Sequence, residues 1–550
     1  MDGANYSPEE FERLTREWKW DVPEYYNFAW DTVDRWAQDK TKLALITVYH
    51  DGRRSKRMTF WEMMATSNQM ANILRKRGIK KGNRVFLMLP RSEEWYIAML
   101  GLCKIGAVAM PTPTLSTAHD IEYRINRAEA VMCITDREGA EKVDQVKDNL
   151  PTLKHKILTN DEKKGWEFGE ELIKKASMHL TRNDVEPTKS TDPLLIYFTS
   201  GTTGNPKMVM HTHAYPIGHT VTARFAQDLK QTDIIWAIAD TGWAKTAWGK
   251  LFGQWIIGAC IMQWQMRGRF YPEVVLNIIQ KYGVSVFCAP PTAYRMMVTN
   301  CNLAEWDFSQ LRHCLSAGEP LNPEVINVWK KHTNRDIYDY YGQTETVALV
   351  ANTKFYPIRQ GSMGKPTIGH HVEILDDDGN PVPQGEEGHI AVKVKPEHPP
   401  GIFHGYWKDD DKTAEVFIGD WYFTGDKAYQ DGDGYFWFVG RADDVIKASG
   451  YRIGPFEVES ALQEHGAVAE SAVIGVPDEV RGEVVKAFII LAPGYEGSEE
   501  LKKELQDFVK NLTAPYKYPR RIDFVTELPK TISGKIKRKE LRKMELEKSK

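Results

Sequence analysis

The chain has 550 residues, 42% of them hydrophobic and 27% charged, and its formal net charge is −3. The length predicts at least two folded domains, and the composition excludes a disordered chain. The near-balance of acidic and basic residues excludes a global positive field for binding nucleic acid or an anionic membrane.

Helix and strand patterns alternate through the first part of the chain. Thr59 and Glu62 have the spacing of a capping box, which predicts a helix that starts at residue 60. We expect a strand at 84–89, a helix at 93–104 and a strand at 107–110, then helices at 272–282 and 323–332, each followed by a strand, at 284–289 and 337–341. This alternation predicts α/β layers with largely parallel sheets.

After about residue 360, short apolar runs are separated by turn residues, as at 378–381 and 431–434. This pattern predicts antiparallel β structure. From residue 443 onward the pattern predicts a compact mix of helix and strand. The expected fold class is therefore α/β, with a large N-terminal domain (1–442) of α/β layers plus a β subdomain, and a small, mobile α+β C-terminal domain (443–550). Residues 537–550 are expected to form a charged, solvated helix.

The chain carries no pattern that favours secretion or membrane insertion. Its six cysteines form no C-x-x-C pair, so we expect reduced, buried thiols. The N-terminus is polar and acidic and lacks an apolar signal segment. The most apolar stretch, 234–262, is interrupted by Asp240, Lys245 and Lys250, which argues against a membrane span. These observations predict a cytoplasmic protein.

An apolar run at 194–198 ends in a loop of glycines and hydroxyl residues that is closed by Lys207. The loop comprises Thr199, Ser200, Gly201, Thr202, Thr203 and Gly204, followed by Asn205 and Pro206. Glycines let backbone N–H groups approach phosphate oxygens, hydroxyls donate further hydrogen bonds, and lysine supplies positive charge. The pattern differs from G-x-x-x-x-G-K-[ST], and a flexible surface loop is the alternative interpretation.

This loop resembles the phosphate-binding signature of the adenylate-forming (ANL) superfamily, which includes acyl-CoA synthetases, luciferases and peptide-synthetase adenylation domains. Five further segments resemble the family's signatures in the family's order: 316–320, 339–345, 422–426, 440–447 and 529–535. Residues 340–345 resemble the AMP-forming acyl-CoA synthetases of the medium-chain type. The resemblance implies that a carboxylic acid, ATP and CoA give acyl-CoA, AMP and pyrophosphate through an acyl-adenylate, with Mg²⁺. Net flow in reverse, to make ATP, stays open.

The resemblance also implies roles for individual residues. Lys207, Thr344 and Lys535 are the expected catalytic groups, and Glu345 is the expected magnesium ligand, since Mg²⁺ prefers one or two carboxylates plus phosphate and water oxygens. The expected nucleotide-binding set comprises the loop residues 199–204 named above together with Lys207, Gly318, Glu319, Pro320, Asp339, Tyr340, Tyr341, Gln343, Thr344, Asp426, Arg441, Arg452 and Lys535.

Within the nucleotide-binding set, Tyr341 is expected to stack on adenine, Asp339 to accept from its amino group, and Asp426 to accept from the ribose hydroxyls. Alternatively, Tyr341 is a core aromatic residue and Asp426 a turn aspartate. The C-terminal domain is expected to rotate about Asp443. It would then bring Ser449, Gly450 and Tyr451 to the CoA arm.

The expected acyl pocket comprises Trp243, Ala244, Lys245, Trp248, Ala317 and Gly342. Two-carbon synthetases of the family carry Trp at the position of Gly342 and usually Val at the positions of Ala244 and Ala317. The acid is therefore expected to be larger than acetate: medium-chain, branched, alicyclic or aromatic. Lys245 either attracts the substrate carboxylate or extends to solvent, and the two tryptophans are equally credible as core aromatics.

Three alternatives stay open at this point: a peptide-synthetase adenylation domain, a luciferase and a catalytically inactive nucleotide sensor. The expected partners are the acid, ATP and CoA, with no nucleic acid. A homo-oligomer and acetylation of Lys535 also stay open. His211, His213, His370 and His371 lack metal-ligand partners in the sequence and are expected to be core or surface residues.

Overall fold

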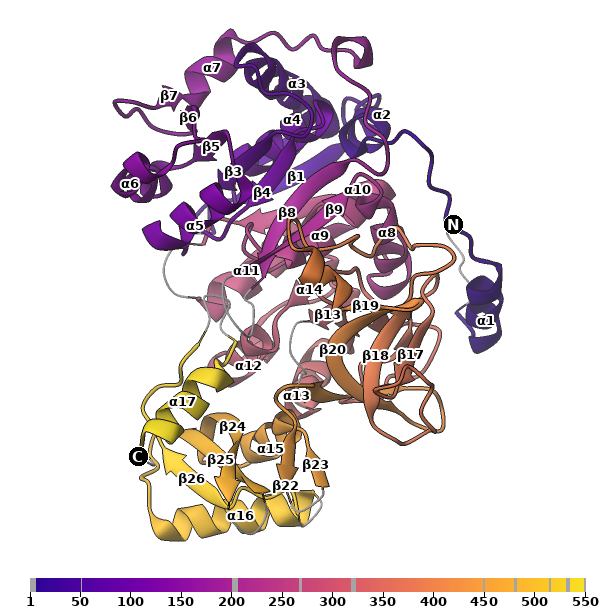
Figure 1. Cartoon of the computed structure of the whole chain (residues 1–550), viewed down its shortest axis with the longest axis vertical. Helices are drawn as coiled ribbons and strands as arrows, with labels where there is room; N and C mark the ends of the chain where they lie inside the picture. Colours follow the sequence, from indigo (N-terminus) through magenta and orange to yellow (C-terminus); the bar gives the residue numbers. More distant parts are fainter. Residues whose placement is uncertain are drawn as a thin grey trace.

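The computed structural model describes residues 6–50, 52–199, 206–266, 270–317, 323–448, 451–478, 482–513, 516–530 and 535–548. Two large β-sheets form the N-terminal part of the molecule (Figure 1). The strands of the first are β3 (Arg84–Met88), β4 (Val108–Pro111), β5 (Met132–Thr135), β6 (His155–Leu158), β7 (Glu167–Phe168), β8 (Pro193–Thr199) and β9 (Lys207–Thr212). Over the described residues their order is β7-β6-β5-β3-β4-β8-β9, and each neighbouring pair is parallel except the β8–β9 hairpin.

The second sheet has a parallel centre and antiparallel ends. Its strands are β1 (Leu43–Val48), β2 (Ser55–Thr59), β10 (Ile234–Ala237), β11 (Cys260–Trp264), β12 (Val286–Ala289), β13 (His313–Ala317), β14 (Ile337–Tyr341), β15 (Val350–Ala351) and β16 (Lys365–Pro366). Their order among the described residues is β16-β15-β14-β13-β12-β10-β11-β1-β2. The predicted α/β alternation with largely parallel sheets is confirmed.

Helices separate and cover the two sheets. The helices of this part are α1 (Pro8–Glu17), α2 (Asp34–Trp36), α3 (Phe60–Lys76), α4 (Glu93–Lys104), α5 (Ala118–Ala128), α6 (Arg137–Gln145), α7 (Gly169–Lys175), α8 (Tyr215–Val221), α9 (Ala244–Lys250), α10 (Phe252–Ile257), α11 (Pro272–Tyr282), α12 (Pro291–Asn300) and α13 (Pro323–Thr333). The largest core cluster joins α3, α4, α9 and α10 to both sheets. A second cluster covers the other face of the nine-stranded sheet with α11–α13, and a third covers the seven-stranded sheet with α5 and α6.

The local signals that predicted individual elements are present in the structure. Thr59 and Glu62 form a reciprocal capping box at the start of α3. Among the described residues, the six cysteines are free thiols, and five of them are buried, whereas Cys301 is half-buried. Cys301 follows directly after α12, where the chain leaves the helix near the surface.

The antiparallel β structure predicted after residue 360 is confirmed. It consists of β17 (Val372–Leu375), β18 (Gly388–Lys393), β19 (Phe417–Ile418), β20 (Trp421–Gln430) and β21 (Phe436–Arg441), with the short helix α14 (Asp410–Ala414). In the described residues the order is β17-β18-β20-β19, β21 pairs with β20, and all four pairings are antiparallel.

The C-terminal part, yellow in Figure 1, is a mixed sheet covered by helices. Its elements are β22 (Ile446–Ala448), β23 (Tyr451–Ile453), α15 (Pro455–Gln463), β24 (Val468–Asp478), β25 (Gly482–Leu491), α16 (Glu499–Leu512), β26 (Arg521–Phe524) and α17 (Arg538–Lys548). The core of this sheet packs on α15 and α16. The charged helix predicted at 537–550 is α17, but one side of it is not solvated: Leu541 is buried, and the side chains of Arg538 and Glu545 are 20% and 13% exposed. Among the described residues, no helix combines the length and the apolar character needed to cross a membrane.

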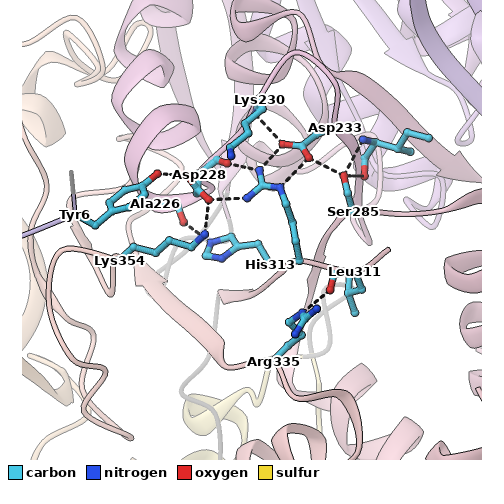
Figure 2. Close-up of polar contacts among 12 residues, drawn as sticks. Tyr6, Ala226, Asp228, Lys230, Asp233, Ser285, Leu311, His313, Arg335 and Lys354 are labelled. Carbon is cyan, nitrogen blue, oxygen red and sulfur yellow. Dashed lines mark hydrogen bonds and ion pairs between the residues drawn. The ribbon is translucent and has the colours of Figure 1, made fainter. Parts of the chain in front are cut away.

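A network of ion pairs around Asp228 and Asp233, which are buried, holds Tyr6, near the N-terminus, and the beginning of β13 (Figure 2). Arg312, the residue before β13, pairs with Asp228, at 2.5 Å from its Nη1 to Asp228 Oδ2, and with Asp233. Lys354 Nζ lies 2.6 Å from the same Asp228 oxygen, and the Tyr6 hydroxyl donates to the other one. The network fixes the strand whose opposite end carries Ala317, a predicted acyl-pocket residue.

Candidate active site

Strand β14 presents alternate residues to opposite faces. Asp339 and Tyr341 lie on one face and are half-buried, whereas Tyr340 is buried on the other face. Burial raises the pKa of Asp339 to about 8, and the positive charge of Lys245 opposes that rise. On the opposite face, the Tyr340 ring lies 5.9 Å from the ring of Trp248, a predicted acyl-pocket residue.

The structure brings segments 339–345 and 422–426 together through Asp426. The Tyr341 hydroxyl donates to Asp426 Oδ2 at 2.6 Å, and Gln343 Nε2 donates to the same oxygen at 2.5 Å. Gln343 in turn accepts from the Tyr422 hydroxyl at 2.9 Å. Asp426 is 5% exposed, so these donors satisfy a nearly buried carboxylate.

Arg441 connects this carboxylate to the predicted hinge. It lies directly opposite Asp426 in the β20–β21 register, with 3.5 Å between Arg441 Nη1 and Asp426 Oδ1. Arg441 Nε lies 3.8 Å from Asp443 Oδ1. The predicted ribose, phosphate and hinge residues therefore form one continuous charged row.

The predicted phosphate loop lies between strands β8 and β9, which pair in antiparallel register. Thr199, at the end of β8, pairs with Lys207, at the start of β9, in antiparallel register. The loop residues between them that were predicted to bind phosphate, Ser200 to Gly204, lie outside the described residues, as do Gly318, Glu319 and Pro320. The chain leaves the sheet at Thr199 and re-enters it at Lys207, so Lys207 lies at the edge of the predicted loop.

Tyr406, which the sequence analysis missed, links Lys207 to Glu345. Lys207 Nζ lies 4.5 Å from the centre of the Tyr406 ring, and the Tyr406 hydroxyl donates to Glu345 Oε1 at 3.0 Å. Its backbone forms an antiparallel bridge with Val209. No local sequence pattern around residue 406 predicts these contacts, because Lys207 and Glu345 both lie far from Tyr406 in the sequence.

The environment of Glu345 suits a cation. Burial raises the pKa of its carboxyl, whereas the Tyr406 hydrogen bond and the charges of Arg441 and Lys207 lower it. Among the described residues no cluster of three or more His, Cys, Asp or Glu side chains is arranged to hold a metal. A single half-buried carboxylate beside the predicted phosphate loop is a donor set that Mg²⁺ accepts when phosphate and water oxygens complete its shell.

The segment that carries Thr344 and Glu345 is held by hydrogen bonds to three successive backbone carbonyl groups. His211 Nε2 contacts the Thr344 carbonyl oxygen at 2.7 Å, the Phe403 amide donates to that of Glu345 at 2.9 Å, and the Tyr215 hydroxyl donates to that of Thr346 at 3.4 Å. Burial lowers the pKa of His211 to about 3, so the ring is neutral and Nε2 donates. His211 is therefore a core residue, as predicted, but one that contacts the site.

Among the predicted acyl-pocket residues, Trp248 lies against Gly342. A Cβ atom on Gly342 would lie 2.3 Å from Trp248 Cη2 and 2.3 Å from the Val347 carbonyl oxygen. The indole of Trp248, itself a predicted pocket residue, therefore lies directly against Gly342. Trp248 and Ala244 are buried on α9, and Trp243, just before the helix, is half-buried.

The other predicted site residues differ in how far the structure describes them. Lys245 Nζ donates to the Ala317 carbonyl oxygen at 2.9 Å, which neither of its two expected roles anticipated. Ser449 and Gly450 lie outside the described residues, and Tyr451 and Arg452 are described as backbone of β23. Lys535 lies beside the Lys530–Ile536 bridge.

Comparison with known proteins gives the same assignment along nearly the whole chain. The sequence model of the AMP-binding enzyme family matches residues 32–407, and that of the AMP-binding enzyme C-terminal domain matches residues 457–535. The chain belongs to the AMP-binding enzyme family. As the resemblance predicted, it is an AMP-forming acyl-CoA synthetase, and its substrates include ATP and CoA.

The relatives match nearly the whole chain. It is 47% identical to acyl-coenzyme A synthetase ACSM3, mitochondrial, of Rattus norvegicus, over 97% of this chain and 93% of the relative, and 45% identical to the human ACSM3 protein, over 99% and 94%. The crystal structure of the anthranilate CoA ligase AuaEII with anthranoyl-AMP matches with a TM-score of 0.88 and 33% identity, covering 96% of this chain and 99% of that one.

The predicted cytoplasmic location is wrong. The curated relatives ACSM3, ACSM4 and ACSM5 are named as mitochondrial, and this finding overturns the expectation. An apolar segment is typical of a secretory signal, whereas mitochondrial targeting segments are amphipathic and rich in arginine. The absence of an apolar stretch therefore carried no information about this compartment.

Proposed function

We propose that this acyl-CoA synthetase acts on a carboxylic acid larger than acetate, of the medium-chain, branched, alicyclic or aromatic class, and requires Mg²⁺. The observation that carries the proposal is the glycine at position 342, where two-carbon synthetases of the family carry Trp. Trp248, from a separate helix, lies against this position, so its indole would form the end of the pocket. Relatives named for anthranilate and benzoate ligation support an acid with a bulky body.

In the proposed first half-reaction, a carboxylate oxygen bonds to the α-phosphorus of ATP and the bond to pyrophosphate breaks. Two anions must meet, so the site must supply positive charge and hydrogen-bond donors. Lys207 would neutralise the departing pyrophosphate, Thr344 would donate to the α-phosphate, and Lys535 would bridge the carboxylate and the α-phosphate.

The nucleotide would be held by the row of groups around Asp426. Tyr341 and Gln343 donate to Asp426, and the ribose hydroxyls would replace part of these hydrogen bonds when the nucleotide binds. Arg441, beside Asp426, would face the ribose and phosphate. Asp339 and Tyr341, on one face of β14, would contact the adenine, with Arg452 as a further phosphate contact.

Glu345 would hold the Mg²⁺ ion, which when bound supplies positive charge to the phosphate oxygens. Tyr406 orients the Glu345 carboxylate by its hydrogen bond, and Lys207 lies over the ring of the same tyrosine. The cation site and the pyrophosphate lysine are thereby supported by a single side chain.

In the proposed second half-reaction, the CoA sulfur bonds to the acyl carbon, the bond to AMP breaks, and the thiol proton is released. Rotation about Asp443 would bring Ser449, Gly450 and Tyr451 to the site. The proposed domains are 1–442 and 443–550, and the short connection between β21, which ends at Arg441, and β22, which begins at Ile446, supports that division.

A pyrophosphate-exchange assay with acids of two to ten carbons and with aromatic acids, each with and without CoA, tests the proposal. We expect exchange to require an acid and Mg²⁺, to be weak with acetate, and to rise with acid size. An acetate optimum would contradict the proposed substrate class while leaving the synthetase assignment intact.

A further inference from the structure

The helix that follows Lys535 is held to the C-terminal domain mainly by ion pairs. Helix α17 buries only Leu541 in the neighbouring apolar cluster, counted over its described side chains. On its other positions, Arg538 pairs with Glu459, Arg542 with Asp444, and Glu545 with Lys486. Charged contacts, rather than apolar packing, therefore set where this helix lies.

The first of these contacts lies three residues after Lys535. Arg538 Nη2 donates to both carboxylate oxygens of Glu459 at 2.7 Å, and Arg538 Nε donates to the Val473 carbonyl oxygen at 3.2 Å. Glu459 is buried and also accepts from the Val473 amide at 2.7 Å. The base of the Lys535 segment is closed by the bridge between Lys530 and Ile536.

The second contact reaches the residue beside the proposed hinge. Arg542, one helical turn after Arg538, donates from Nη2 to Asp444 Oδ1 at 2.8 Å, and Arg538 Nη1 lies 3.8 Å from Asp444 Oδ2. Both arginines occupy one face of α17, since they are four residues apart. The Asp444 side chain is 15% exposed and that of Arg542 is 26% exposed, so water screens this pair only in part.

We propose that Arg542 and Arg538 position Lys535 by tying the segment that carries it to Asp444, directly after the hinge residue Asp443. Asp444 lies on the C-terminal side of the hinge, so the ion pairs would turn together with the domain. Lys535 and Asp444 would then move as one rigid body, so rotation about the hinge would bring the lysine to the same position each time. The inference rests on the proposed catalytic role of Lys535.

The energetics favour a positional effect over a purely stabilising one. A partly exposed ion pair contributes little to stability, because water screens the two charges and both side chains lose conformational freedom. A displacement of about 1 Å in a reacting group, however, can cost ~10² in rate. Loss of the Arg542–Asp444 pair should therefore change the chemistry of adenylation much more than it changes folding.

The test compares two half-reactions in Arg542→Ala, Arg542→Lys and Lys535→Ala, with Lys543→Ala as the matched control. Lys543 lies next to Arg542 on α17, its side chain is 77% exposed, and it takes no part in the Asp444 contacts. We expect Arg542→Ala to lower pyrophosphate exchange by roughly 10- to 100-fold and thioester formation from supplied acyl-adenylate by less than about 2-fold. Arg542→Lys should recover part of the exchange rate, and Lys543→Ala should match the unmodified enzyme.

The outcomes distinguish a failure of the positioning role of Arg542 from a failure of the catalytic role of Lys535. If Lys535→Ala loses exchange and Arg542→Ala keeps it, the positioning role is overturned and the function of Lys535 stands. If Arg542→Ala loses both half-reactions equally and its melting temperature falls, the arginine is merely structural and the inference fails. If Lys535→Ala loses both half-reactions equally, the proposed role of Lys535 itself fails. Arg542 is the primary variant because Arg538→Ala would leave the buried Glu459 without its main partner.

Discussion

Replacement of Gly342 by alanine tests the construction of the acyl pocket. The added Cβ would lie 2.3 Å from Trp248 Cη2, 3.0 Å from Trp248 Cζ2 and 2.3 Å from the Val347 carbonyl oxygen. Carbon atoms in favourable contact are about 3.5–4.0 Å apart, so the indole must move by more than about 1 Å. The carbonyl belongs to the backbone, so it cannot rotate away as a flexible side chain would.

The strain has a predictable size and direction. Overpacking of this kind typically costs about 1–3 kcal/mol. The displaced indole should also shorten the pocket, and each methylene that loses its burial costs about 0.8 kcal/mol, or roughly 4-fold in kcat/KM. We expect Gly342→Ala to lower kcat/KM for octanoate more than for butanoate, with a lower melting temperature.

The assay is the steady-state rate of AMP formation with a series of straight-chain acids, together with thermal unfolding. Gly432→Ala is the control, because its added Cβ meets no heavy atom within 4 Å. Equal kcat/KM ratios for long and short acids in Gly342→Ala and the unmodified enzyme would refute the assignment of Trp248 to the pocket end. A fall in stability without a change in these ratios would refute it equally.

Three further predictions concern catalysis and pH. Lys535→Ala should lower pyrophosphate exchange by roughly 10²- to 10³-fold and spare thioester formation from supplied acyl-adenylate; equal losses would contradict its role. Burial already raises the pKa of Glu345, and the Tyr406 hydrogen bond lowers it, so Tyr406→Phe should raise that pKa further and shift the acid limb of the exchange rate to higher pH; an unmoved limb would contradict this. Burial lowers the pKa of His370 to about 4, so between about pH 6.5 and 4 the unfolded chain binds more protons than the folded chain. The unfolding free energy should therefore fall as the pH drops through that window, by at most ~3 kcal/mol from this residue. His370→Gln should flatten this pH dependence, and an unchanged slope would argue against a neutral, buried imidazole.

The sequence predicted the layers of the fold because its signals are local. The capping box at Thr59 and Glu62 marks the start of α3, and the alternating apolar runs mark the parallel strands. The turn residues after residue 360 likewise predicted antiparallel pairing. Each of these signals depends on neighbours within a few residues, so it can be read without knowledge of the tertiary structure.

The contacts that complete the site depend on residues far apart in the chain. Tyr406 reaches Glu345, and Trp248 reaches Gly342, across long sequence separations. The sequence placed Gly342 and Trp248 in one predicted pocket, but it could not show that the indole lies directly against the glycine. Non-local packing of this kind follows from the arrangement of the two sheets, and no spacing in the sequence encodes it.

The central claim is that Lys207, Glu345 and Lys535 together let a carboxylate reach the α-phosphorus of ATP. Its most direct test is the release of AMP and pyrophosphate by the purified protein supplied with Mg²⁺, ATP, CoA and a panel of organic acids. We expect equal amounts of AMP, pyrophosphate and acyl-CoA with an acid larger than acetate. Tight binding of ATP and Mg²⁺ without any acid-dependent release of pyrophosphate would contradict the account.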